Sequence, residues 1–85
     1  MKINNYIQKP DKLQAVRLTK HNIHKVADWC NGIPVVHVYI QCRVIYKIGT
    51  KWVFLYEGEW LVKNKYDEFN NYANKYFLKY FKKIK

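Results

Sequence analysis

The residues best suited to chemistry alternate along the segment 35–48. His37, Tyr39, Arg43 and Lys47 all fall on odd positions, so a continuous strand would project their side chains from one face. A guanidinium group can hold two phosphate oxygens at once, and a tyrosine ring can stack on a nucleobase. This row therefore favours a phosphate-bearing ligand or nucleic acid, although the solvated face of an ordinary antiparallel strand has a similar composition.

Arginine is the second chemical signal, because nearly all other cations of the chain are lysines. The two arginines are Arg17 and Arg43. Arginine offers a planar fork of donors that lysine lacks, so its use here indicates a demand for geometry. We therefore predict five ligand-binding residues: Arg43, Tyr39, His37, Lys47 and Arg17.

Groups that could support catalysis or bind a metal are sparse. Glu57 and Glu59 flank Gly58, and such a pair is more typical of a solvated turn than of a glycosidase. His21 and His24 have helical spacing, but the sequence supplies no third ligand beside them. The sequence predicts a protein that is not an enzyme and that has no metal site and no cofactor.

Cys30 and Cys42 do not form a Cys-x-x-Cys unit or any familiar zinc spacing. The N-terminus has no apolar signal-peptide core, so the chain is not expected to enter an oxidising compartment. We expect two free thiols that pack as small apolar side chains.

Composition indicates one folded domain over residues 1–85. The chain has 85 residues, of which 49% are apolar and 18% aromatic, and this content excludes intrinsic disorder. No apolar run is long enough to span a membrane. We expect a soluble protein that makes no membrane contact.

The charge balance points to an anionic partner. Sixteen lysines and arginines against six acidic residues give a net charge of +10 at pH 7. Such a field attracts phosphates, nucleic acids or acidic protein surfaces. A genome rich in A and T would also raise the lysine count, so a merely solvated basic surface is the alternative.

Hydrophobic spacing predicts the main elements. Residues 13–19 read as a strand. Residues 20–31 read as an amphipathic helix whose apolar positions recur at helical spacing, with Thr19 as N-cap and Gly32 just past the end. Residues 35–48 read as one long strand with a bend near Gln41 and Cys42, because fourteen extended residues would span about 46 Å.

Turns divide the following segment into a meander. Residues 52–56 and 60–63 read as strands, with turns at 49–51 and 57–59. The tail over 66–85 is ambiguous, because its apolar residues match a helical stripe while its tyrosines and phenylalanines favour strands. The expected fold class is α+β: a small curled antiparallel sheet of four to six strands, the helix at about 20–31, and a tail that packs back.

Several short motifs resemble a widespread group of small bacteriophage and prophage proteins. They are a Lys9-Pro10 start, Ala15-x-x-Leu18-Thr19, the helix end Trp29-Cys30-x-Gly32, and the hairpin Gly58-Glu59-Trp60. Glu59 replaces the usual Asp, and either Phe77-x-x-x-Phe81 or Tyr76-x-x-x-Tyr80 replaces a closing Phe-x-x-x-Tyr. The resemblance implies no catalytic residues, and it implies a tail built as strand, short helix and strand.

The resemblance also implies a setting, namely a phage protein in the host cytoplasm that serves host takeover or counter-defence. Within it, the leading hypothesis is binding or sequestration of an anionic, nucleotide-type ligand. Binding of nucleic acid and inhibition of a host or defence protein stay open as alternatives. Surplus aromatics, including Trp52 or Trp60, predict a homo-oligomer.

Overall fold

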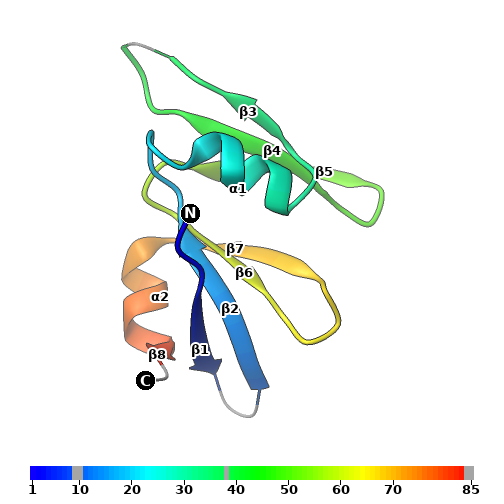
Figure 1. Ribbon diagram of the computed structural model, residues 1–85, viewed down its shortest axis with the longest axis vertical. Helices are drawn as coiled ribbons and strands as arrows, with labels where there is room; N and C mark the ends of the chain where they lie inside the picture. Colours follow the sequence, from blue (N-terminus) through cyan, green and yellow to red (C-terminus); the bar gives the residue numbers. More distant parts are fainter. Residues whose placement is uncertain (9–10, 38, 84–85) are drawn as a thin grey trace.

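The computed structural model describes residues 1–8, 11–37 and 39–83, which form an α+β fold (Figure 1). The Lys9-Pro10 motif lies outside the described residues. The elements in chain order are β1 (Asn4–Gln8), β2 (Asp11–Arg17), α1 (Ile23–Trp29), β3 (Ile33–Val35), β4 (Arg43–Ile48), β5 (Lys51–Tyr56), β6 (Trp60–Lys63), β7 (Phe69–Tyr72), α2 (Asn74–Tyr80) and β8 (Lys82–Lys83).

The described strands form two antiparallel sheets. The first has five strands in the order β7-β6-β2-β1-β8, and the second has three in the order β3-β4-β5. Figure 1 shows α1 between the two sheets, and α2 beside the five-stranded sheet. The predicted α+β class is confirmed, and the five-stranded sheet has the expected size. The second sheet was not expected.

The single strand predicted over 35–48 is wrong. β3 ends at Val35 and β4 begins at Arg43, and these two residues lie opposite each other in an antiparallel pair. A continuous strand of about 46 Å would exceed the longest dimension of the fold, 38 Å. The segment therefore folds back on itself, and only β4 alternates between buried and more exposed positions.

The predicted meander is also wrong, because β6 pairs with β2 and leaves β5. The crossing occurs at Gly58, whose φ of 90° favours glycine. There the backbone N–H of Gly58 donates to the carbonyl of Leu18 at 2.8 Å, and the N–H of Leu18 donates to the carbonyl of Glu59 at 2.9 Å. These bonds steer the chain from one sheet into the other.

Helix α1 buries the apolar stripe that its sequence predicts, namely Ile23, Val26 and Ala27. The helix is shorter at both ends than the predicted range of 20–31, since it begins at Ile23 and ends at Trp29. Asn22 occupies the N-cap position, while the Thr19 hydroxyl accepts the Asn22 N–H at 3.3 Å from outside the helix.

The C-terminus of α1 is a Schellman motif in which Asn31 takes the left-handed position, with φ of 54°. The Gly32 N–H donates to the Ala27 carbonyl at 2.7 Å, and the Asn31 N–H donates to the Asp28 carbonyl at 3.3 Å. Gly32 is required for another reason. A Cβ there would lie 2.8 Å from the carbonyl oxygen of Ile45, so glycine lets α1 lie close to β4.

The tail follows the strand, short helix and strand alternative, as β7, α2 and β8. Its helix is anchored by Phe77, whose ring stacks on Trp60 with centroids 4.0 Å apart. Phe77 and Phe81 pack with Leu13, Ala15 and other buried residues on the face of the five-stranded sheet that α2 covers.

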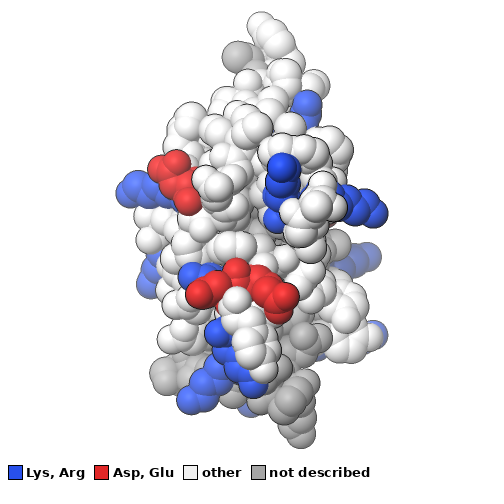
Figure 2. All heavy atoms as spheres, turned by 90° about the vertical axis from the view of Figure 1, so that its right-hand side faces the viewer, with Lys and Arg blue, Asp and Glu red and all other residues white. Residues whose placement is uncertain are grey.

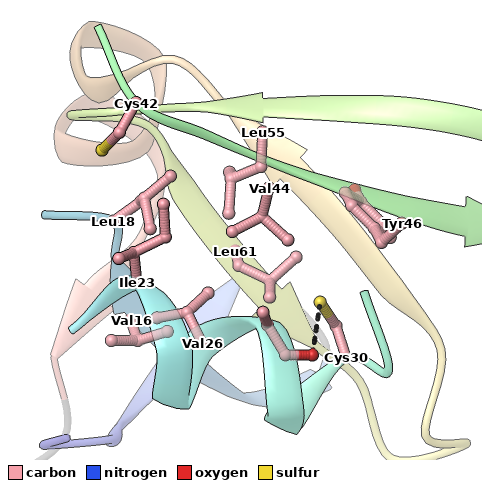
Figure 3. Packing of buried hydrophobic residues seen from close by; sticks show 11 residues of the cluster. Val16, Leu18, Ile23, Val26, Cys30, Cys42, Val44, Tyr46, Leu55 and Leu61 are labelled. Carbon is pink, nitrogen blue, oxygen red and sulfur yellow. Dashed lines mark hydrogen bonds between the residues drawn. The ribbon is translucent and has the colours of Figure 1, made fainter. Parts of the chain in front are cut away.

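The larger hydrophobic cluster lies between the two sheets and α1 (Figure 3). Tyr46, the largest fully buried side chain, brings a hydroxyl into it. That hydroxyl donates to Asn71 Oδ1 at 2.6 Å, and Asn71 Nδ2 donates to the Phe54 carbonyl at 3.3 Å. Burial raises the pKa of Tyr46 well above its ordinary value, so the hydroxyl stays protonated and can donate. Asn71 on β7 thus joins the two sheets.

We predict that Tyr46→Phe lowers the free energy of unfolding by about 1–3 kcal/mol, because Asn71 loses its donor while the ring packing is kept. For a chain of this length the total is only about 4–13 kcal/mol, so thermal unfolding followed by circular dichroism should detect the change. Tyr66→Phe, which removes a hydroxyl from a side chain that is 70% exposed, is the matched control. Equal melting temperatures for the two variants would contradict the bridge.

Both cysteines are buried, as predicted, and both are free. The Cys30 thiol donates to the Ala27 carbonyl at 3.7 Å (Figure 3), and burial raises its pKa to about 11. The Cys42 thiol lies 3.3 Å from Glu57 Oε1. Burial, followed by this carboxylate, raises the pKa of Cys42.

We predict that a thiol reagent modifies the native protein slowly at pH 8, because the reactive thiolate is both disfavoured and covered. The same reagent should modify two thiols per chain quickly in denaturant, as read by intact mass. Rapid modification of both thiols under native conditions would show that this core is open.

Candidate functional site

The structure separates the residues predicted to form one binding row. His37 and Tyr39 lie in the loop between β3 and β4, whereas Arg43 and Lys47 lie on β4. The prediction that all four share a strand face is therefore wrong. Tyr39 is 96% exposed and lines a shallow depression with Lys20 and other residues, but not with Arg43.

Arg17, the other predicted ligand-binding residue, has a partner within the chain. It is the last residue of β2, and its Nε donates to the Gly58 carbonyl at 2.9 Å. This bond holds the turn at which the chain crosses between the sheets. The Arg17 guanidinium therefore has a structural role.

Arg43 and Lys47 instead join a different group of side chains, on the side of the three-stranded sheet that faces away from the core. Cross-strand register places Tyr56 opposite Arg43, Phe54 opposite Ile45, and Trp52 opposite Lys47. We call this side the outer sheet face; its residues are Ile33, Val35, Arg43, Ile45, Lys47, Trp52, Phe54 and Tyr56.

The alternation of β4 and β5 explains why these side chains point outward. Val44, Tyr46 and Leu55 are fully buried on the inner side, so the residues between them must face the other way. The short turn at Gly49, with φ of 63°, closes the hairpin and sets this register.

Three aromatic side chains of the outer sheet face are substantially exposed. Trp52 is 51% exposed, Phe54 48% and Tyr56 40%. They follow one another at every second residue of β5, so their Cα atoms are about 6.8 Å apart. The ring centroids of Phe54 and Tyr56 are 6.2 Å apart. Exposed aromatics in a regular row provide stacking surfaces for planar groups.

The charged groups of the outer sheet face are cations. Arg43 is half-buried beside Tyr56, and the Lys47 ammonium lies 4.7 Å from the centroid of the Trp52 ring. The two glutamates beyond β5 are engaged elsewhere: Glu59 accepts the Tyr56 N–H at 2.7 Å, and Glu57 accepts the Cys42 N–H at 3.3 Å. These carboxylates fix the turn, which is more than the solvated role expected of them.

Charge alone does not delimit a site on the side of the molecule where the β4–β5 and β6–β7 turns project. Figure 2 views this side and shows cations scattered around large uncharged areas, with acidic groups near the middle and at the upper left. The combination of aromatic row and neighbouring cations is therefore the more specific feature.

Sequence reasoning treated Trp52 only as a surplus aromatic and did not single out Phe54 and Tyr56. The signal was nevertheless present, because aromatics at 52, 54 and 56 alternate with Val53 and Leu55. That pattern is typical of a strand with one buried and one aromatic face.

Metal-ligating side chains do not gather in groups of three or more within residues 1–8, 11–37 and 39–83. In the same part of the chain, both helices are too short to cross a bilayer. Comparisons of the chain with protein-family models, curated proteins and solved structures return no match.

Proposed function

We propose that this protein is a non-catalytic binding protein that holds single-stranded nucleic acid on the outer sheet face. The observation that carries the proposal is the row of Trp52, Phe54 and Tyr56 opposite Lys47 and Arg43. Open sheets with two or three exposed aromatics are a recurrent way of binding unpaired bases.

Each part of the face has a defined role in this proposal. The aromatic rings stack on successive bases, and each stack is worth about 1–3 kcal/mol. Arg43 and Lys47 pair with the phosphates that connect those bases. The net charge of +10 draws the polyanion toward the protein and makes the affinity depend on salt.

An extended single strand of nucleic acid fits this face better than a single enclosed nucleotide does. A sequestered nucleotide would need a pocket that combines a cation fork with a stacking ring, as envisaged for Arg43 and Tyr39. Tyr39 lies in the loop between β3 and β4, whereas Arg43 begins β4, and the depression at Tyr39 does not include Arg43. On the outer sheet face, the aromatic side chains are exposed along the whole of β5.

The resemblance to phage proteins supplies the biological setting of the proposal. In the host cytoplasm, a small basic protein that covers unpaired nucleic acid would act in host takeover or counter-defence. This setting rests on the short sequence motifs alone.

We predict that Phe54→Ala weakens binding of a fluorescein-labelled ten-nucleotide deoxythymidine strand by about five- to a hundredfold, because the central stacking surface is lost. Fluorescence anisotropy at 0.15 M salt measures the change. Tyr80→Ala removes an aromatic that is 50% exposed on α2, away from the outer sheet face, and should leave the affinity unchanged.

Substitutions at Arg43 test the phosphate contact within the same titration. Arg43→Ala should weaken binding about tenfold, and Arg43→Lys should recover only part of it, because an ammonium cannot bridge two oxygens. Equal affinities of the Phe54→Ala and Tyr80→Ala variants would refute binding at this face.

A protein surface is the second candidate partner for the same face. Ile33, which is 52% exposed, and the half-buried Val35 and Ile45 extend the aromatic row into a flat apolar area beside Arg43, a composition typical of protein interfaces. The predicted homo-oligomer would use such an area. Light scattering separates the cases: a dimer that Phe54→Lys dissociates would assign the face to self-association.

A further inference from the structure

A concave site lies on the five-stranded sheet, lined by residues of β1, β2 and β6. Its cavity has a volume of about 380 Å³, within the range of small-molecule sites. Side chains of Asn5, Lys12, Gln14 and Lys63 line it from three neighbouring strands, and the turn after β6 closes one side with Asn64, Lys65 and Asp67.

The strand register explains why these side chains converge. Asn5 lies opposite Gln14, and Gln14 lies opposite Lys63, so the three form one row across β1, β2 and β6. Lys12 is two residues before Gln14 and projects from the same face. This face is the one that α2 leaves uncovered, because Leu13 and Ala15 between these positions pack toward α2.

The donor set of the cavity is suited to an oxyanion. Three lysines and the side-chain amides of Asn5 and Gln14 line it against one carboxylate, that of Asp67. The Asn64 amide, which also lines the cavity, donates to Glu68 Oε1 at 3.0 Å. Ammonium and amide groups donate hydrogen bonds to phosphate oxygens, and charge-assisted bonds of this kind are the stronger ones.

Lys63 is the positioned cation of the group. Its Nζ forms an ion pair with Asp67 Oδ1 at 3.1 Å, and it lies 5.9 Å from the ring centroids of both Trp29 and Phe69. The lysine side chain is 25% exposed, whereas the Asp67 side chain is 81% exposed. The carboxylate at the rim can therefore swing away and yield its place to an incoming anion.

We propose that this cavity binds a compact multivalent phosphate, of the pyrophosphate or triphosphate class, with Lys12, Lys63 and Gln14 as donors and Asp67 as the group that the anion displaces. Asp67 also lines a smaller hollow with Lys47 of the outer sheet face, whereas Lys12, Gln14 and Lys63 do not line that hollow. The proposed donors are therefore distinct from the outer sheet face, and the proposal does not depend on nucleic-acid binding.

The test uses calorimetry of the full chain with inorganic pyrophosphate at constant ionic strength. We expect one site per chain, and a loss of about tenfold in affinity for Lys12→Ala. Lys75→Ala removes the same charge from α2, on the opposite side of the five-stranded sheet, and should leave the affinity unchanged. Phe54→Ala should also keep full pyrophosphate affinity, which separates this site from the outer sheet face.

Asp67→Asn gives the sharper readout, because it should increase the affinity about two- to fivefold by removing the competing carboxylate. Asparagine tolerates the left-handed φ of 61° at this position, so the turn is preserved. The proposal is overturned if pyrophosphate does not bind, if Lys12→Ala and Lys75→Ala lose equal affinity, or if Asp67→Asn binds more weakly.

Discussion

The hydrogen bond from the buried Tyr46 hydroxyl to Asn71 is the polar constraint that joins the two sheets across their shared apolar core. A hydroxyl in an apolar core must find a partner, and here the partner stands on a strand of the other sheet. Asparagine is a poor strand former, and its presence on β7 is explained by its two bonds, one from Tyr46 and one to the Phe54 carbonyl. The hairpin of β4 and β5 is thereby held at one position over the five-stranded sheet.

Once the β4–β5 hairpin is held there, the alternation of side chains along each strand decides which residues face outward. The inner positions Val44, Tyr46 and Leu55 belong to the core, so Trp52, Phe54 and Tyr56 must face outward. Small domains seldom leave three large rings half-exposed in a row, and such patches mark interaction surfaces. The outer sheet face is therefore built by the same packing of β4 and β5 that stabilises the protein.

Local signals in the sequence predicted the parts of the fold that depend on neighbouring residues. The stripe of Ile23, Val26 and Ala27 predicted α1, and Gly49 predicted the tight turn of the hairpin. The division into two sheets could not be predicted, because it rests on distant contacts such as Arg17 with Gly58. For the same reason, the predicted row of His37, Tyr39, Arg43 and Lys47 does not form. The sequence of 35–48 alternates in the same way whether the segment is one strand or two paired arms. Arg43 and Lys47 lie on β4, and their cross-strand neighbours are Tyr56 and Trp52 of β5.

Binding of single-stranded nucleic acid to the outer sheet face is tested most directly by nuclear magnetic resonance. An unlabelled deoxythymidine ten-mer would be titrated into ¹⁵N-labelled protein at 0.15 M salt. We predict that the resonances of the Trp52 indole N–H and of the β4 and β5 amides shift together and saturate, while the resonances of the α2 amides do not shift. Shifts confined to other surfaces, or spread evenly over all lysine-rich segments, would contradict it.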